Sequence, residues 1–132
     1  MHLLDPQEAR NGVFTYRPRG EYSLVEAVDL VSATIADCRR RGVDKLLIDA
    51  RGVKGVPIPT LIDRFLMAED WAQAAQGRLV MVLVVSPEYI HPRKFAVKVA
   101  LHLGLTSEVY SSEDEALQWL LERAPPPLGD SQ

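Results

Sequence analysis

Apolar residues recur along the chain in two alternating patterns, one typical of helices and one typical of strands. Between residues 24 and 41 they are spaced by four and three positions, which places them on one face of a helix. Residues 45–49 and 79–85 have continuous apolar centres instead, as expected for strands that helices cover on both faces. Residues 13–17 alternate, with Phe14 and Tyr16 on one side, which is the period of a half-buried strand. The chain is therefore expected to alternate strands with helices.

Capping residues mark where the predicted helices begin and end. Ser23 and Glu26 have the spacing of a capping box, in which each side chain accepts a hydrogen bond from the other residue's backbone N–H, and Gly42 ends this first helix. Thr60 and Asp63 form a weaker variant of the same box at the start of a second helix. The sequence predicts three helices after the first, over residues 60–76, from Pro92 to Gly104, and from Ser112 onward.

Each predicted helix has a set of apolar residues that is expected to face the sheet. Cys38 lies on such a set, so we expect it to be a buried structural thiol rather than a reactive one. The expected inward residues are Leu24, Val28, Val31, Ile35 and Cys38 in the first helix, Leu61, Phe65, Ala68, Ala72 and Ala75 in the second, Phe95, Ala96, Val99, Ala100 and Leu103 in the third, and Leu117, Leu120 and Leu121 in the fourth.

The order of elements predicts a single α/β domain over residues 1–124. Strands that alternate with helices are joined by right-handed crossovers, which gives a mostly parallel sheet of four to five strands flanked by four helices. We expect the strands at 46–48 and 79–85 to be neighbours in its interior, and residues 2–4 to add an antiparallel edge. Two segments are expected to lack regular structure: the loop 50–59, which is rich in glycine and proline, and a disordered tail at 125–132.

Charge and the length of the apolar runs exclude several classes of function. A net charge of -3 argues against nucleic-acid binding, because neutralising phosphates requires an excess of Lys and Arg. The longest apolar run, 79–85, is too short to span a bilayer. Cys38 is the single cysteine, so neither an intramolecular disulfide nor a cysteine-based metal site is expected. The first six residues have no basic segment followed by an apolar one, and we expect a cytoplasmic protein.

Polar residues follow the two continuous apolar strands, and ligands in open α/β sheets bind beyond such strand ends. The candidate ligand or partner loops place Asp49, Arg51 and Lys54 after one strand and Ser86 and His91 after the other. No nucleotide-binding glycine pattern or hydrolase nucleophile motif surrounds them, and the histidines lack the spacing of metal ligands. We therefore expect a non-enzymatic protein without metal or cofactor. A weaker alternative is an enzyme that uses Asp49, Arg51 and His91.

Three segments point to a family: 46–52 (Leu-Leu-Ile-Asp-Ala-Arg-Gly), 92–95 (Pro-Arg-Lys-Phe) and 115–120 (Glu-Ala-Leu-Gln-Trp-Leu). With the order of elements over residues 13–123, they resemble a poorly characterised bacterial subgroup of the STAS family, the anti-sigma-factor-antagonist-like domains. The resemblance implies a non-enzymatic switch that binds a protein partner or a small ligand. It also implies a candidate phosphoacceptor at Thr60. Pro59 stands where phosphorylated members have Asp, so we favour the helix cap at Thr60 over the phosphoacceptor.

The second predicted helix carries more apolar surface than one sheet face needs. Met67, Trp71 and Ala74 flank its inward residues, and Trp119 lies off the inward set of the last helix. Because such residues are enriched in interfaces, we expect Trp71 to be buried by a second chain or a ligand rather than by its own sheet. The leading hypothesis is a homodimeric STAS-like regulatory or protein-interaction module. The alternative is a carrier or sensor that holds an apolar or anionic small ligand between loop 50–59, the second helix and the sheet.

Overall fold

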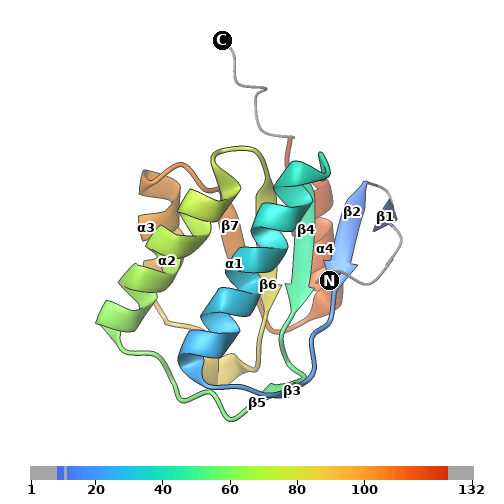
Figure 1. Cartoon of the computed structure of the whole chain (residues 1–132). Coiled ribbons are helices and arrows are strands. Elements are labelled where there is room, and N and C mark those ends of the chain that lie inside the picture. Colours follow the sequence, from blue (N-terminus) through green and yellow to red (C-terminus); the bar gives the residue numbers. More distant parts are fainter. Residues whose placement is uncertain (1–8, 11, 125–132) are drawn as a thin grey trace.

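The computed structural model describes residues 9, 10 and 12–124, and these form a sheet flanked by helices on both faces (Figure 1). The strand order is β1-β2-β4-β6-β7, with antiparallel pairing between β1 and β2 and parallel pairing elsewhere. The predicted α/β fold with a mostly parallel sheet is confirmed. The strands are β1 Ala9–Arg10, β2 Val13–Tyr16, β4 Lys45–Asp49, β6 Val80–Val84 and β7 Ser107–Tyr110.

Three helices cover one face of the sheet and a fourth covers the other (Figure 1). They are α1 Leu24–Arg40, α2 Leu61–Ala75 and α3 Phe95–His102 on the first face, and α4 Glu113–Leu121 on the second. Helix α2 packs between α1 and α3. No helix in the described part of the chain is both long and apolar enough to cross a membrane.

The sheet register divides the strand residues between two cores. Strands β4 and β6 pair in parallel, with Leu46 opposite Met81 and Leu47 opposite Val82, which confirms their predicted adjacency in the interior. Leu46 and Met81 pack under the three helices, whereas Leu47 and Val82 pack against α4. Strand β1 forms the expected antiparallel edge of the sheet. Residues 2–4, which were predicted to form this edge, lie outside the described residues, as does the predicted tail from residue 125.

Helix α1 agrees with its predicted cap and inward residues. The Ser23 hydroxyl accepts from the Glu26 N–H at 3.1 Å, and the Glu26 carboxylate accepts from the Ser23 N–H at 2.9 Å. Val28, Val31, Ile35 and Cys38 are buried, and Leu24 is half-buried. Burial, together with the neighbouring Asp37 carboxylate, raises the pKa of the Cys38 thiol to about 12, so the thiolate form is disfavoured.

Helix α2 is rotated from the orientation that its apolar residues predict. Leu61 and Phe65 were expected to face the sheet, but they are 54% and 42% exposed. Arg64 takes the inward position instead, one turn before Ala68. The buried face therefore runs through residues 64, 68, 71, 72 and 75, which is a helical stripe that begins with a charged residue.

Helix α3 starts three residues after the predicted Pro92. Lys94 precedes it in the left-handed conformation, with φ of 51°, so the helical backbone cannot extend through that residue. The Arg93 N–H donates to His91 Nδ1 at 3.0 Å and the Lys94 N–H to the His91 carbonyl at 2.9 Å, which fixes a turn in place of a first helical turn. Leu103, expected to be buried, is exposed, and Leu105 is buried in its place.

Helix α4 buries fewer of its leucines than predicted. Ser112 caps it by accepting from the Glu115 N–H at 3.3 Å. Ala116 and Leu120 are fully buried, whereas Leu117 is half-buried and Leu121 is exposed. Small Ala116 brings this helix close to the sheet, so a narrow face of α4 is enough to cover it.

Loop 50–59 contains a short strand that the glycine and proline content did not predict. Strand β5 (Val53–Lys54) pairs in parallel with β3 (Gly20–Glu21), and the Tyr22 N–H donates to the Lys54 carbonyl at 2.9 Å. A Cβ on Gly52 would lie 3.0 Å from the Pro18 carbonyl oxygen, so the close approach of the two segments requires glycine. The loop is thereby attached to the segment that follows β2.

Candidate functional site

A cavity of about 290 Å³ lies between the three-helix layer and the sheet. Helix α2 covers it, α1 and α3 form its sides, β6 and β7 form its floor, and the loops after β4 and β6 close its end. Its inward helix positions include Ala27, Ala68, Ala96 and Ala100, which are too small to fill the space above the strands. The volume is at the small end of the roughly 300–1,000 Å³ that is typical of small-molecule sites.

The inner walls of the cavity are apolar. Trp71 and Met67 of α2 face Met81 and Leu83 of β6 across it, with Val31 of α1 at the side. An apolar wall of this kind favours a ligand with an apolar body, because such a ligand loses contact with water on entering.

Charged residues lie at the end of the cavity where the strands finish. The lining contains four cationic side chains and two carboxylates, although the whole chain carries a net charge of -3. Lys94 is paired with Glu108 at 3.0 Å and Arg51 with Asp49 at 2.6 Å, which leaves the two cations Lys54 and Arg64 against the one carboxylate of Glu88. The charged lining residues are Arg51, Lys54, Arg64, Glu88, Lys94 and Glu108.

Arg64 is the one buried cation in the described part of the chain, with 9% of its surface exposed. Its Nη1 donates to the Tyr89 carbonyl oxygen at 3.1 Å. No carboxylate of the described residues lies within 4.0 Å of its guanidinium group. Burial lowers the pKa of Arg64 because a charged guanidinium is poorly solvated there.

Tyr89 holds the end wall of the cavity in place. It ends a short 3₁₀ helix, η1 Pro87–Tyr89, that follows β6. Its carbonyl accepts from Arg64 and its hydroxyl group donates to the Val56 carbonyl oxygen in loop 50–59. One residue thus links α2, the loop after β4 and the loop after β6.

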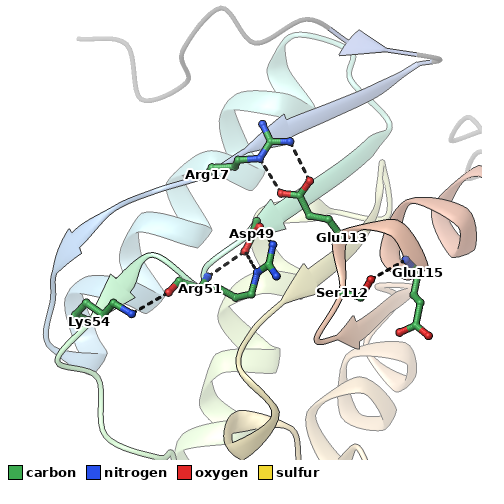
Figure 2. A network of polar contacts seen from close by, with 7 residues as sticks. All are labelled: Arg17, Asp49, Arg51, Lys54, Ser112, Glu113 and Glu115. Carbon is green, nitrogen blue, oxygen red and sulfur yellow. Dashed lines mark hydrogen bonds and ion pairs between the residues drawn. The ribbon is translucent and has the colours of Figure 1, made fainter.

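Asp49 and Arg51 belong to a polar cluster beside the cavity (Figure 2). Arg51 binds both carboxylate oxygens of Asp49, and Arg17 binds both carboxylate oxygens of Glu113 at the start of α4. Burial alone would raise the pKa of Asp49, but the hydrogen bonds from the side chain and backbone N–H of Arg51 outweigh it, and the pKa is lowered to about 2. The Arg17–Glu113 pair ties the segment after β2 to the N-terminus of α4.

The structure brings four of the five predicted loop residues to the cavity. Arg51, Lys54, Ser86 and His91 line it, whereas Asp49 does not and is buried against Arg51. His91 is fixed by its Nδ1, which accepts from the Arg93 N–H.

Arg64 and Tyr89 line the cavity, and the sequence pattern predicted neither of them as a site residue. Arg64 had one signal in the sequence: it lies four residues before Ala68 and seven before Trp71 on one helical stripe. Because arginine is rarely buried, the sequence pattern predicted that Leu61 and Phe65 face the sheet instead of Arg64. Tyr89 had no such signal, because its position depends on the turn that follows β6.

The expectation that Trp71 requires a second chain or a ligand for its burial is wrong. Trp71 is 8% exposed in the single chain, and its indole Nε1 donates to the Val28 carbonyl oxygen of α1 at 3.2 Å. Met67 and Ala74 are half-buried against the same core. Trp119 is half-buried against the α4 core, with the Arg123 guanidinium carbon 5.0 Å from its ring centroid. These four residues therefore fulfil packing roles within one chain.

The exposed apolar surface of α2 lies elsewhere, on its first two turns and the preceding loop. Leu61 and Phe65, and likewise Ile62 and Leu66, are four residues apart and so lie side by side along the helix. We call this surface the α2 patch; its members are Ile58, Leu61, Ile62, Phe65 and Leu66, all of them exposed.

Thr60 caps α2 in a complete capping box. Its hydroxyl accepts from the Asp63 N–H at 3.0 Å, and the Asp63 carboxylate accepts from the Thr60 N–H at 2.9 Å. The cap that the sequence predicts is therefore present. The phosphoacceptor role implied by the family resemblance stays a prediction.

Within the described ranges, no three His, Cys, Asp or Glu side chains are grouped so that they could hold a metal ion. Comparisons with models of protein families, with curated proteins and with solved structures find no match to this chain. The resemblance to the STAS family thus rests on the sequence segments and on the order of elements.

Proposed function

We propose that this protein is a non-enzymatic carrier or sensor that holds a small, mainly apolar ligand in the cavity under α2. The observation that supports this most directly is the cavity itself, which combines an apolar interior with a buried, partly satisfied cation, Arg64. A few placed polar groups in an apolar pocket are typical of small-molecule sites. A cytoplasmic location is part of the proposal, since reducing conditions suit a chain with one buried thiol, Cys38.

The arrangement of the polar residues favours binding over catalysis. Asp49 is bound by Arg51 through two hydrogen bonds and does not line the cavity. His91 lines the cavity, but one of its ring nitrogens accepts a backbone hydrogen bond. The weaker alternative, an enzyme using Asp49, Arg51 and His91, would need Asp49 to leave its ion pair first.

Native mass spectrometry of the protein purified from its own host tests the proposal. We expect a bound small molecule on the unmodified chain and its loss from Ala100→Phe, which would fill the cavity from α3. Ala33→Phe is the matched control, because Ala33 is half-buried on α1 and does not line the cavity. A bound mass that survives in Ala100→Phe with the fold intact would refute the cavity as the binding site.

A second candidate function is the STAS-like protein-interaction module, and the α2 patch favours it. The five residues of the patch are apolar, so the patch is complementary to a second copy of itself in a two-fold contact. Sedimentation equilibrium at several protein concentrations tests this homodimer. We expect a dimer that Leu66→Glu dissociates and that Leu101→Glu, an exposed leucine of α3 outside the patch, leaves intact. A monomeric unmodified chain would contradict the homodimer.

A further inference from the structure

The buried Arg64 has more hydrogen-bonding capacity than the chain uses. A guanidinium group has five N–H donors in a planar fork. Only Nη1 has a hydrogen-bond partner among the described residues, the carbonyl of Tyr89. The remaining donors belong to a side chain that is nine-tenths buried and lines the cavity. Its Nε and Nη2 are not buried without a partner, so they stay accessible to an occupant, and no carboxylate of the described residues lies within 4.0 Å to neutralise the charge.

The hydrogen bond to the Tyr89 carbonyl does not by itself explain why residue 64 is an arginine. A single backbone carbonyl needs one donor, which a neutral glutamine side chain supplies without a buried charge. Arginine adds a planar fork that matches the two oxygens of a carboxylate. Two further cations of the lining are neutralised within the chain, because Arg51 is paired with Asp49 and Lys94 with Glu108. Lys54 has no carboxylate within 4.0 Å among the described residues, so an entering anion meets Lys54 and Arg64 against the single unpaired carboxylate of Glu88.

The apolar wall begins next to this cation. Met67 and Trp71 follow Arg64 by three and seven residues, so the three side chains lie along one face of α2. A ligand that reaches Arg64 with one end therefore places its other end between α2 and the sheet. At roughly 30 Å³ for each volume the size of a water molecule, the cavity holds roughly ten non-hydrogen atoms.

We infer that the cavity binds an apolar monocarboxylate, with its carboxylate on the Arg64 guanidinium group and its apolar body against Met67 and Trp71. This inference rests on the proposed function, since it names the ligand class for the same cavity. Arg64 is the residue that selects the anion. Contact with the apolar wall would stabilise any apolar ligand of this size, whether or not it has a carboxylate.

Calorimetric titration of the full chain with octanoate and with 1-octanol tests the inference. The two probes share an eight-carbon chain and differ in the charged end. We expect octanoate to bind at least tenfold more tightly than 1-octanol. Arg64→Gln should remove this preference, because glutamine keeps a donor for Tyr89 but has no charge. Arg78→Gln, at an exposed arginine outside the cavity, should leave it unchanged.

The outcomes separate the inference from the proposed function. Equal affinity for the two probes, or a preference for octanoate that persists in folded Arg64→Gln, overturns the inference and leaves the cavity as a binding site. Binding of neither probe overturns both. The comparison of probes on the unmodified chain decides the matter even where Arg64→Gln does not fold. A Trp119→Phe chain locates the bound probe, since its fluorescence then comes from Trp71 in the cavity wall alone.

Discussion

Arg51 binds both carboxylate oxygens of Asp49 from only two residues away, with Nε 2.9 Å from Oδ1 and Nη2 2.6 Å from Oδ2. The Arg51 backbone N–H also donates to Oδ1, at 3.1 Å. The loop after β4 therefore begins with a closed ring of charged contacts. Asp49 lies outside the cavity lining, so a change at Asp49 tests this pair without removing a lining side chain.

The first prediction concerns pH. The pKa of Asp49 falls from 3.8 to about 2 in the folded chain, so the pair stabilises the fold above pH 3.8 and loses this effect as the pH falls towards 2. Asp49→Asn should lower the free energy of unfolding by about 1–2 kcal/mol at pH 7, a value discounted because Arg51 is half exposed to solvent. Urea denaturation should show this difference shrinking towards pH 2. A difference that stays constant down to pH 2 would contradict the assignment.

The second prediction concerns the cap of α2. Thr60→Ala should cost about 1 kcal/mol, because the Asp63 N–H then loses its acceptor, whereas Thr60→Asp should be tolerated since Asp also caps helices. Thermal denaturation of both variants measures this. A role for Thr60 as a phosphoacceptor predicts a different result for one variant: Thr60→Asp would change partner binding while leaving stability alone, and a pull-down that compares the two variants measures this.

The third prediction concerns Gly52. Its Cβ in Gly52→Ala would lie 3.0 Å from the Pro18 carbonyl oxygen and 3.1 Å from Arg19 Cγ, so β3 and β5 must move apart. We expect a cost of about 1–2 kcal/mol, as for other overpacked sites. Hydrogen exchange should be faster at the N–H groups of Gly20 and Tyr22, which donate across this pair of strands. In Gly77→Ala, at a turn with open space, the same two N–H groups should exchange as in the unmodified chain.

The fourth prediction concerns Trp71. Trp71→Phe should cost about 1–2 kcal/mol, because it removes the indole N–H that donates to the Val28 carbonyl and reduces the buried side-chain volume, and Trp71→Glu should unfold the chain. Circular dichroism and chemical denaturation measure both. Trp119→Phe is the control and should cost less, since Trp119 is only half-buried. A folded Trp71→Glu chain would show that this side chain is not needed in the core.

The sequence predicted features that depend on a few neighbouring residues. The capping box at Ser23 and the strand at 45–49 with helices over both of its faces are such features, and both are present. Local hydrogen bonds and the pleat of a strand determine them, so they are readable without the rest of the chain.

The features that the sequence did not predict depend on contacts between distant segments. Arg64 faces inward because α2 is oriented by its neighbours α1 and α3 and because Tyr89 supplies an acceptor for it from 25 residues away. Strand β5 exists because Gly20 and Glu21 lie beside it. The strand propensity of residues 50–59 cannot reveal that Gly20 and Glu21 lie beside them. Their glycine and proline content therefore predicted an irregular segment.

The two hydrogen bonds of Tyr89 bear on how fast a ligand of the proposed cavity could enter and leave. Through its hydroxyl and its carbonyl, this residue fastens Val56 and Arg64 to the same short turn. If a ligand enters the proposed cavity past this turn, the same hydrogen bonds must open on its arrival and on its departure. Weakening the Tyr89–Val56 bond would then raise both rates. The residence time of such a ligand would depend on the protein's own hydrogen bonds, while its affinity would depend on the residues that line the cavity.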